Sequence, residues 1–135
     1  MPQALSLPAQ RMLIDQYAQR DLVAFVRRAF ETVVPGEVLH INWHIHAMAH
    51  QLERVRQGKC KRLLVTIPPR SLKSIVTSVS FPAFVLGHDP TTKIVCASYS
   101  HELAVKHAID FRAVMKVRMV QAGIPTHSDQ PREEH

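Results

Sequence analysis

The sequence predicts an α/β fold, an incomplete parallel sheet with helices before it and packed against it. Two short apolar runs, residues 63–67 and 93–98, have the length and the branched side chains of buried strands. A segment with helical spacing, residues 73–86, lies between them. Two strands joined through a helix form a right-handed parallel crossover, so we expect a β-α-β unit.

A short turn connects the first apolar run to this helical segment. Pro68 and Pro69 end the run, and Lys73 and Ser74 begin the helical pattern. Backbone N–H groups at a helix start lack partners within the helix, and with the helix dipole they favour an anion. Lys73 offers a flexible ammonium for terminal phosphates, and Ser74 offers an oxygen ligand for magnesium. The stretch therefore predicts a strand, a phosphate-binding loop and a helix, part of a P-loop NTPase fold.

The loop departs from the usual pattern of Gly, four residues and then Gly-Lys-Ser/Thr. Alignment on Lys73 and Ser74 places Ile67 and Leu72 at the two glycine positions. Glycine normally permits unusual dihedral angles and close approach of the backbone to phosphate. A Lys-Ser pair after a buried strand also occurs by chance in α/β proteins, so the pattern alone leaves both interpretations open.

Three stretches resemble the ATPase domain of the large terminase subunit of tailed bacteriophages and prophages. They are L-L-V-T-I-P-P-R-S-L-K-S, then S-F-P-A-F-V-L-G-H-D-P, and finally K-I-V-C-A-S-Y-S-H-E-L-A. The resemblance covers residues 42–115 and keeps the order of elements throughout. That family uses a deviant loop that keeps Arg and Lys-Ser while the glycines are replaced.

This resemblance implies an ATP site with Mg²⁺. Arg70 and Lys73 take catalytic roles, with the Arg70 guanidinium stabilising the charge that develops during hydrolysis. Ser74 takes the magnesium role. The residues expected to contact the nucleotide are Pro69, Arg70, Ser71, Leu72, Lys73 and Ser74.

Trp43 is a further candidate for nucleotide contact. In a terminase-like layout the helix before the loop lies near the nucleotide, where an aromatic ring can stack on a base. The interpretation that we favour is that Trp43 anchors its helix to the core.

Partners and location also follow from the resemblance: double-stranded DNA, the terminase small subunit and the capsid portal, in the cytoplasm of a bacterial host cell. No apolar run approaches the roughly 20 residues that a membrane span requires, and the N-terminus lacks a signal-peptide pattern. The net charge of +6, from 17 Lys and Arg against 11 Asp and Glu, favours polyanions, but a solvated basic surface explains it equally well. An incomplete sheet with exposed edges would also favour self-association.

The 135 residues allow one domain with a core of modest size. We expect a loose lead-in over residues 1–7, a partial ATPase-like domain over 8–122 and a disordered tail over 123–135.

Three amphipathic helices are expected outside the β-α-β helix, and Pro82 is expected to kink or stop that central helix. The first has its apolar stripe at Leu22, Phe25, Val26, Ala29, Phe30 and Val33. The second runs from an N-cap at Asn42 to Gly58, with its stripe at Ile45, Met48, Ala49, Leu52 and Val55. The last starts near His101 and buries Leu103, Ala104, His107 or Ala108, Phe111, Val114 and Met115.

Other chemically active side chains have a structural interpretation beside the functional one. His46 and His50 are four apart, but no third ligand is evident, so we do not expect a metal there. Cys60 and Cys96 are expected to be buried free thiols. Residues 98–100 would lie on the same rim as the loop, although Ser100 also fits a helix N-cap.

Hydrolysis needs an acidic residue at the end of a further strand, and no such pattern follows Ser100. Asp110 and Glu102 fall on a helix, and the nuclease half of a large terminase is absent. We therefore expect an N-terminal fragment of a phage DNA-packaging terminase that binds ATP weakly without turning it over.

The alternative is a non-catalytic remnant or interaction module that binds DNA, capsid or terminase partners through basic helices, for instance at Arg27 and Arg28. A small nucleotide kinase or another phosphate-loop enzyme is a third possibility. It would require a second substrate site, for which the sequence offers no candidate.

Overall fold

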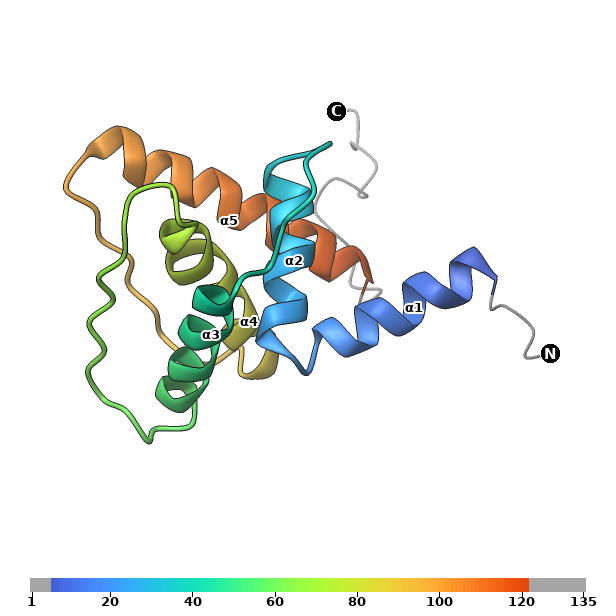
Figure 1. The fold of residues 1–135 in the computed structure, drawn as a ribbon, viewed down its shortest axis with the longest axis horizontal. Coiled ribbons are helices and arrows are strands. Elements are labelled where there is room, and N and C mark those ends of the chain that lie inside the picture. Colours follow the sequence, from blue (N-terminus) through green and yellow to red (C-terminus); the bar gives the residue numbers. More distant parts are fainter. Residues whose placement is uncertain (1–5, 122–135) are drawn as a thin grey trace, which may run out of the picture.

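The computed structural model describes residues 6–121, and over this range the chain is built from helices (Figure 1). Helix α1 (Leu7–Ala18) leads into α2 (Leu22–Val33) and α3 (Trp43–Arg56). A π-helix, η1 (Ile75–Ser80), continues directly into α4 (Phe81–His88), and the long helix α5 (His101–Gln121) follows. None of these helices is long and apolar enough to cross a membrane.

The predicted α/β fold is wrong for the described part of the chain, which contains no strand and no sheet. Residues 62–68 and 92–98 are extended, but neither is paired into a ladder. Their apolar side chains are largely in solvent: Leu64 is 86% exposed and Val95 is 93% exposed. Branched residues favour an extended backbone, but a sheet also requires a neighbouring strand within about 4.8 Å. Here both segments run along the same side of the helices (Figure 1), and neither is paired into a ladder.

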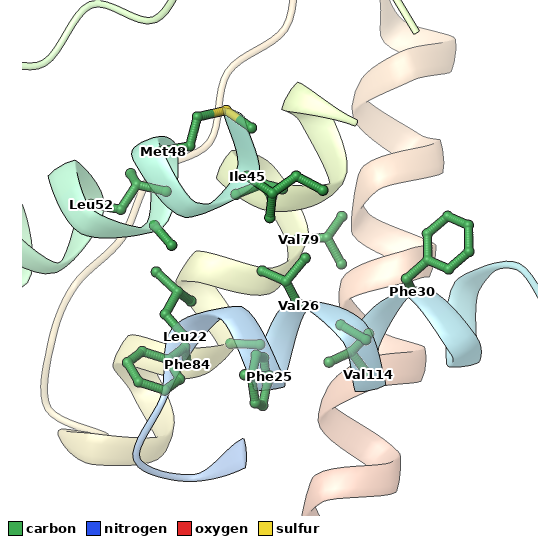
Figure 2. Packing of buried hydrophobic residues seen from close by; sticks show 14 of the residues in the cluster. Leu22, Phe25, Val26, Phe30, Ile45, Met48, Leu52, Val79, Phe84 and Val114 are labelled. Carbon is green, nitrogen blue, oxygen red and sulfur yellow. The ribbon is translucent and has the colours of Figure 1, made fainter. Parts of the chain in front are cut away.

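The hydrophobic core lies where the helical run 73–88 packs against α2, α3 and α5. The largest fully buried side chains come from three of these elements: Val26, Ile45, Val76, Val79, Ser80 and Phe84. Figure 2 shows the rings of Phe25 and Phe84 next to each other, with ring centroids 5.5 Å apart in an edge-on arrangement. Such an aromatic pair adds specific geometry to the burial of apolar area.

The helices expected before and after the predicted β-α-β unit are confirmed as α2, α3 and α5. In α2 the buried stripe is the expected one, with Val33 half-buried at its end, and in α3 only Val55 is less buried than expected. In α5 Val114 alone of the expected residues is buried, and Ala108 is exposed. The others are half-buried: Leu103, Ala104, His107, Phe111 and Met115. The helix extends to Gln121, and the expected tail of residues 123–135 lies outside the described residues.

Helix α1 is not anticipated by the sequence analysis as a separate element. It begins at Leu7, within the expected loose lead-in, and residues 1–5 lie outside the described range. It contacts α2, where the Arg28 Nη2 and Asp15 Oδ1 atoms form an ion pair at 2.9 Å.

Pro82 neither stops nor interrupts the helical run. The preceding π-turn accommodates it, because the Phe81 N–H bonds the Val76 carbonyl five residues back, and Pro82 then falls in the first turn of α4. Proline is tolerated there, since first-turn N–H groups of an α-helix need no partner within it. The backbone change expected at Pro82 therefore takes the form of a wider turn upstream.

Gly58 ends α3 as expected. Its φ is +74°, its N–H bonds the Val55 carbonyl at 3.0 Å, and the Lys59 N–H bonds the Arg54 carbonyl at 2.9 Å. These two bonds form a Schellman cap, which requires a left-handed residue at this position.

We predict that Gly58→Ala lowers the free energy of unfolding by about 1 kcal/mol, because alanine is strained at positive φ. Urea denaturation with an unchanged slope measures this loss. Gly58→Asn is the matched control and should lose less, since asparagine tolerates the left-handed region. Equal stability of Gly58→Ala and the wild type would contradict the prediction.

Candidate phosphate-binding loop

The predicted phosphate-binding loop lies between the extended segment 62–68 and the central helical run. Helical backbone begins at Lys73, and the Val76 N–H bonds the Leu72 carbonyl at 3.0 Å. The Thr77 hydroxyl donates to the Lys73 carbonyl at 2.8 Å, one turn into the helix. The order of an extended segment, a turn and a helix starting at Lys73-Ser74 is therefore present, although the extended segment is not a strand.

The loop backbone turns through two left-handed residues. Arg70 has φ +64° and Leu72 has φ +59°, and no other non-glycine residue of the described range has positive φ. This region costs an ordinary residue about 1–2 kcal/mol. Leu72 occupies the position where the usual pattern has its second glycine, so the chain adopts a glycine-like conformation there without glycine.

The two residues at the glycine positions turn their side chains to the core. Ile67 and Leu72 are both half-buried and pack against the hydrophobic cluster. This apolar contact offsets the strain at Leu72 and fixes both ends of the loop to the helical body.

The polar side chains of the loop point outward into solvent. Arg70, Lys73 and Ser74 are exposed, and neither cation forms an ion pair with a described residue. Pro69 is also exposed, whereas Ser71 is half-buried. Two unpaired cations beside a helix start make this loop electropositive, a setting suited to an anion.

Trp43 does not anchor α3 to the core, contrary to the favoured interpretation. Its side chain is 81% exposed, and its ring lies edge-on to the neighbouring His44 ring with centroids 6.3 Å apart. The first turn of α3 therefore presents an aromatic surface to solvent.

The remaining candidate residues belong to other parts of the chain than the loop. His46 and His50 are exposed, and the described residues contain no group of three or more side chains suited to a metal ion. The prediction of two buried thiols is wrong for Cys96, which is exposed, while Cys60 is half-buried with its thiol 3.3 Å from the Arg62 carbonyl. The Ser100 carbonyl accepts from the Ala104 N–H at 3.0 Å, as an N-cap carbonyl does.

A basic segment that includes the loop was missed by the sequence analysis. Residues 54–88 contain no Asp or Glu but seven Lys and Arg, namely Arg54, Arg56, Lys59, Lys61, Arg62, Arg70 and Lys73. Arg56 is held by Glu53, with Nε–Oε distances of 3.0 Å, and these hydrogen bonds lower the pKa of the Glu53 carboxyl. Lys59, Lys61 and Arg62 are exposed and form no ion pair within the described range. The absence of acidic residues over this span was the available signal.

No protein-family model matches the chain, and no match was found among curated proteins or solved structures.

We predict that Arg70→Gly raises the free energy of unfolding by about 0.5–1 kcal/mol, because glycine adopts positive φ without strain. Chemical denaturation measures the change. Arg70→Ala is the control, since it removes the guanidinium but keeps the backbone strain, and it should bring no gain. A loss of stability in Arg70→Gly would contradict the prediction.

Proposed function

We propose that loop 68–74 binds the phosphates of a magnesium nucleotide, as the ATP-binding part of a phage-type DNA-packaging ATPase. In this proposal Lys73 contacts the terminal phosphates, Ser74 binds Mg²⁺ and Arg70 contacts the phosphates through its guanidinium. The nucleotide approaches from solvent, where all three side chains are exposed.

The observation that carries the proposal is the pair of left-handed residues, Arg70 and Leu72, directly before the helix start. Strained backbone of this kind persists where the surrounding structure imposes it, and it is concentrated at functional sites. The Lys-Ser pair, the Arg and the resemblance to terminase loops agree with a phosphate ligand. The proposal rests on this loop and not on a sheet, because a helix start can bind phosphate without one.

The proposal concerns nucleotide binding by this loop and assigns no residue to hydrolysis. Exposed Trp43 remains a candidate for stacking on the base.

We predict that Lys73→Ala weakens binding of a fluorescent ATP analogue with Mg²⁺ at least tenfold, the effect of losing a hydrogen bond to a charged group, about 1.5–3 kcal/mol. Fluorescence anisotropy measures the affinity. Lys59→Ala, which removes an exposed lysine outside the loop, is the matched control and should bind as the wild type does. Equal affinity of the wild type and Lys73→Ala would reject the nucleotide site.

A second candidate function is binding of a nucleic-acid backbone, as in an interaction module without a nucleotide site. The acid-free basic segment favours it, with Lys59, Lys61 and Arg62 exposed after α3. The helical residue Arg28 is a weaker candidate than expected, because it is paired with Asp15 and Glu31.

For this second function we predict salt-sensitive binding of duplex DNA that Lys73→Ala leaves largely unchanged. Replacing Lys59, Lys61 and Arg62 together by Ala should reduce the slope of log affinity against log salt by about 0.9 for each DNA phosphate that is no longer neutralised. Titration at several salt concentrations measures the slope. The same slope in the triple variant would exclude this segment as the DNA-binding surface.

A further inference from the structure

Helix α1 leaves most of its large apolar side chains in solvent. Five of them are between 51% and 76% exposed: Leu7, Met12, Leu13, Ile14 and Tyr17. The one buried residue of α1 is Ala18, and the helix packs mainly against α2. Figure 1 shows α1 extending away from the other helices. All five side chains except Met12 project from one side of α1, because their positions are three, four and seven residues apart. We call this side, formed by Leu7, Leu13, Ile14 and Tyr17, the α1 face.

The stability of α1 as a helix requires more packing than the described residues provide. A helix of about 12–15 residues is marginal in water unless it packs an apolar face, and α1 has 12 residues. No side chain caps its N-terminus, its first turn has no acidic residue and its last turn has no basic residue. The ion pair between Asp15 and Arg28 is partly exposed, so it contributes only about 0–1 kcal/mol. Cover on the α1 face would supply the missing apolar contact.

A groove of about 670 Å³ lies next to the α1 face. Its lining comes from three helices and includes Ile14, Tyr17, Val23, Ala24, Arg27 and His46. Ile14 and Tyr17 also belong to the α1 face, so the face and the groove form one continuous surface. No residue of loop 68–74 lines the groove, which is therefore separate from the proposed phosphate site. This mixture of apolar and charged side chains is typical of the surfaces through which proteins associate.

We propose that two copies of this chain associate through α1, with α1 of the second copy lying antiparallel on the α1 face and beside the groove. Such an isologous pair uses the same surface on both copies. An antiparallel arrangement places Arg11 of one copy toward the Asp15 end of the other, whereas a parallel arrangement places Arg11 beside Arg11. Opposed helix dipoles favour the same direction. This surface replaces the sheet edges from which self-association was expected.

The size of the contact determines the strength of the dimer. A stable interface buries about 800 Å² on each partner. At 1.5 Å per residue the 12 residues of α1 are about 18 Å long, so one pair of these helices falls short of that area. Contact with the groove adds surface from α2 and α3. We therefore expect a reversible dimer with a Kd of about 10 µM.

Analytical ultracentrifugation of the full chain between about 1 and 200 µM tests the proposal. We expect the mass to rise with concentration from one chain toward two. Lys73→Ala should behave in the same way, so the dimer and the proposed phosphate loop can fail independently. A wild type that stays at one chain throughout, or that grows beyond two chains, would overturn the proposal.

Two matched double variants test whether α1 forms the contact. Leu13→Gln with Ile14→Gln removes the centre of the α1 face but keeps residues that favour a helix, and we expect it to raise the Kd of the dimer at least tenfold. Leu64→Gln with Val95→Gln makes the same chemical change at exposed positions outside α1 and should leave the Kd unchanged. None of these four side chains belongs to the buried core, so both variants should fold. A dimer that persists in the first variant, or that is lost in the second, would place the contact elsewhere and reject the proposal.

Cysteine cross-linking tests the antiparallel direction. Leu13 lies near the middle of α1, and Leu7 lies about 9 Å away at its start. In an antiparallel pair centred on Leu13, the two copies of residue 13 meet, whereas the two copies of residue 7 are about 18 Å apart, beyond the reach of a disulfide. Mild oxidation should therefore link Leu13→Cys at least tenfold faster than Leu7→Cys, and mass spectrometry separates these links from any through the native Cys60 and Cys96. Equal rates at the two positions would contradict the antiparallel pair.

Discussion

Burial of the helical run 73–88 at the centre of the molecule is the constraint on which the rest of the described structure depends. Val76, Val79, Ala83 and Phe84 are at most 1% exposed, and α2, α3 and α5 all pack against this run. Its first residue is Lys73, so the same packing that holds the core also fixes the end of the loop. A change in the seating of this helix would move the backbone N–H groups at residues 73–76.

The π-turn in the middle of this helical run is explained by Pro82. Pro82 has no N–H to donate, and a regular helix would leave the Ser78 carbonyl without its bond. The wider turn of η1 shifts the register before Pro82, and the helix continues as α4.

Helices α2, α3 and α5 were predictable because apolar residues recur in them at helical spacing, and α3 also has clear ends at Asn42 and Gly58. Helix α1 has a weaker pattern, with Ala18 as its one buried residue, and was not anticipated. The prediction of two strands was wrong, because a run such as residues 63–67 favours an extended backbone but does not encode the neighbouring strand that a sheet requires. The predictions that Trp43 and Cys96 are buried were wrong for a related reason. These residue types are buried on average, but the burial of a single side chain depends on which other residues pack over it. At the loop, the Lys-Ser pair indicated where to look, but the left-handed angles of Arg70 and Leu72 depend on contacts of Ile67 and Leu72 with the core that no local pattern encodes.

The unpaired segment 62–68 is also open to proteases. A protease binds its substrate as an extended strand, and this segment is already extended, exposed over most of its length, and begins at Arg62 directly after Lys61. Cleavage by a trypsin-like enzyme beside these residues would separate α1–α3 from the rest of the chain in sequence. The two pieces would remain associated, because Phe25, Val26 and Ile45 on one side and Val79 and Phe84 on the other belong to a single buried cluster.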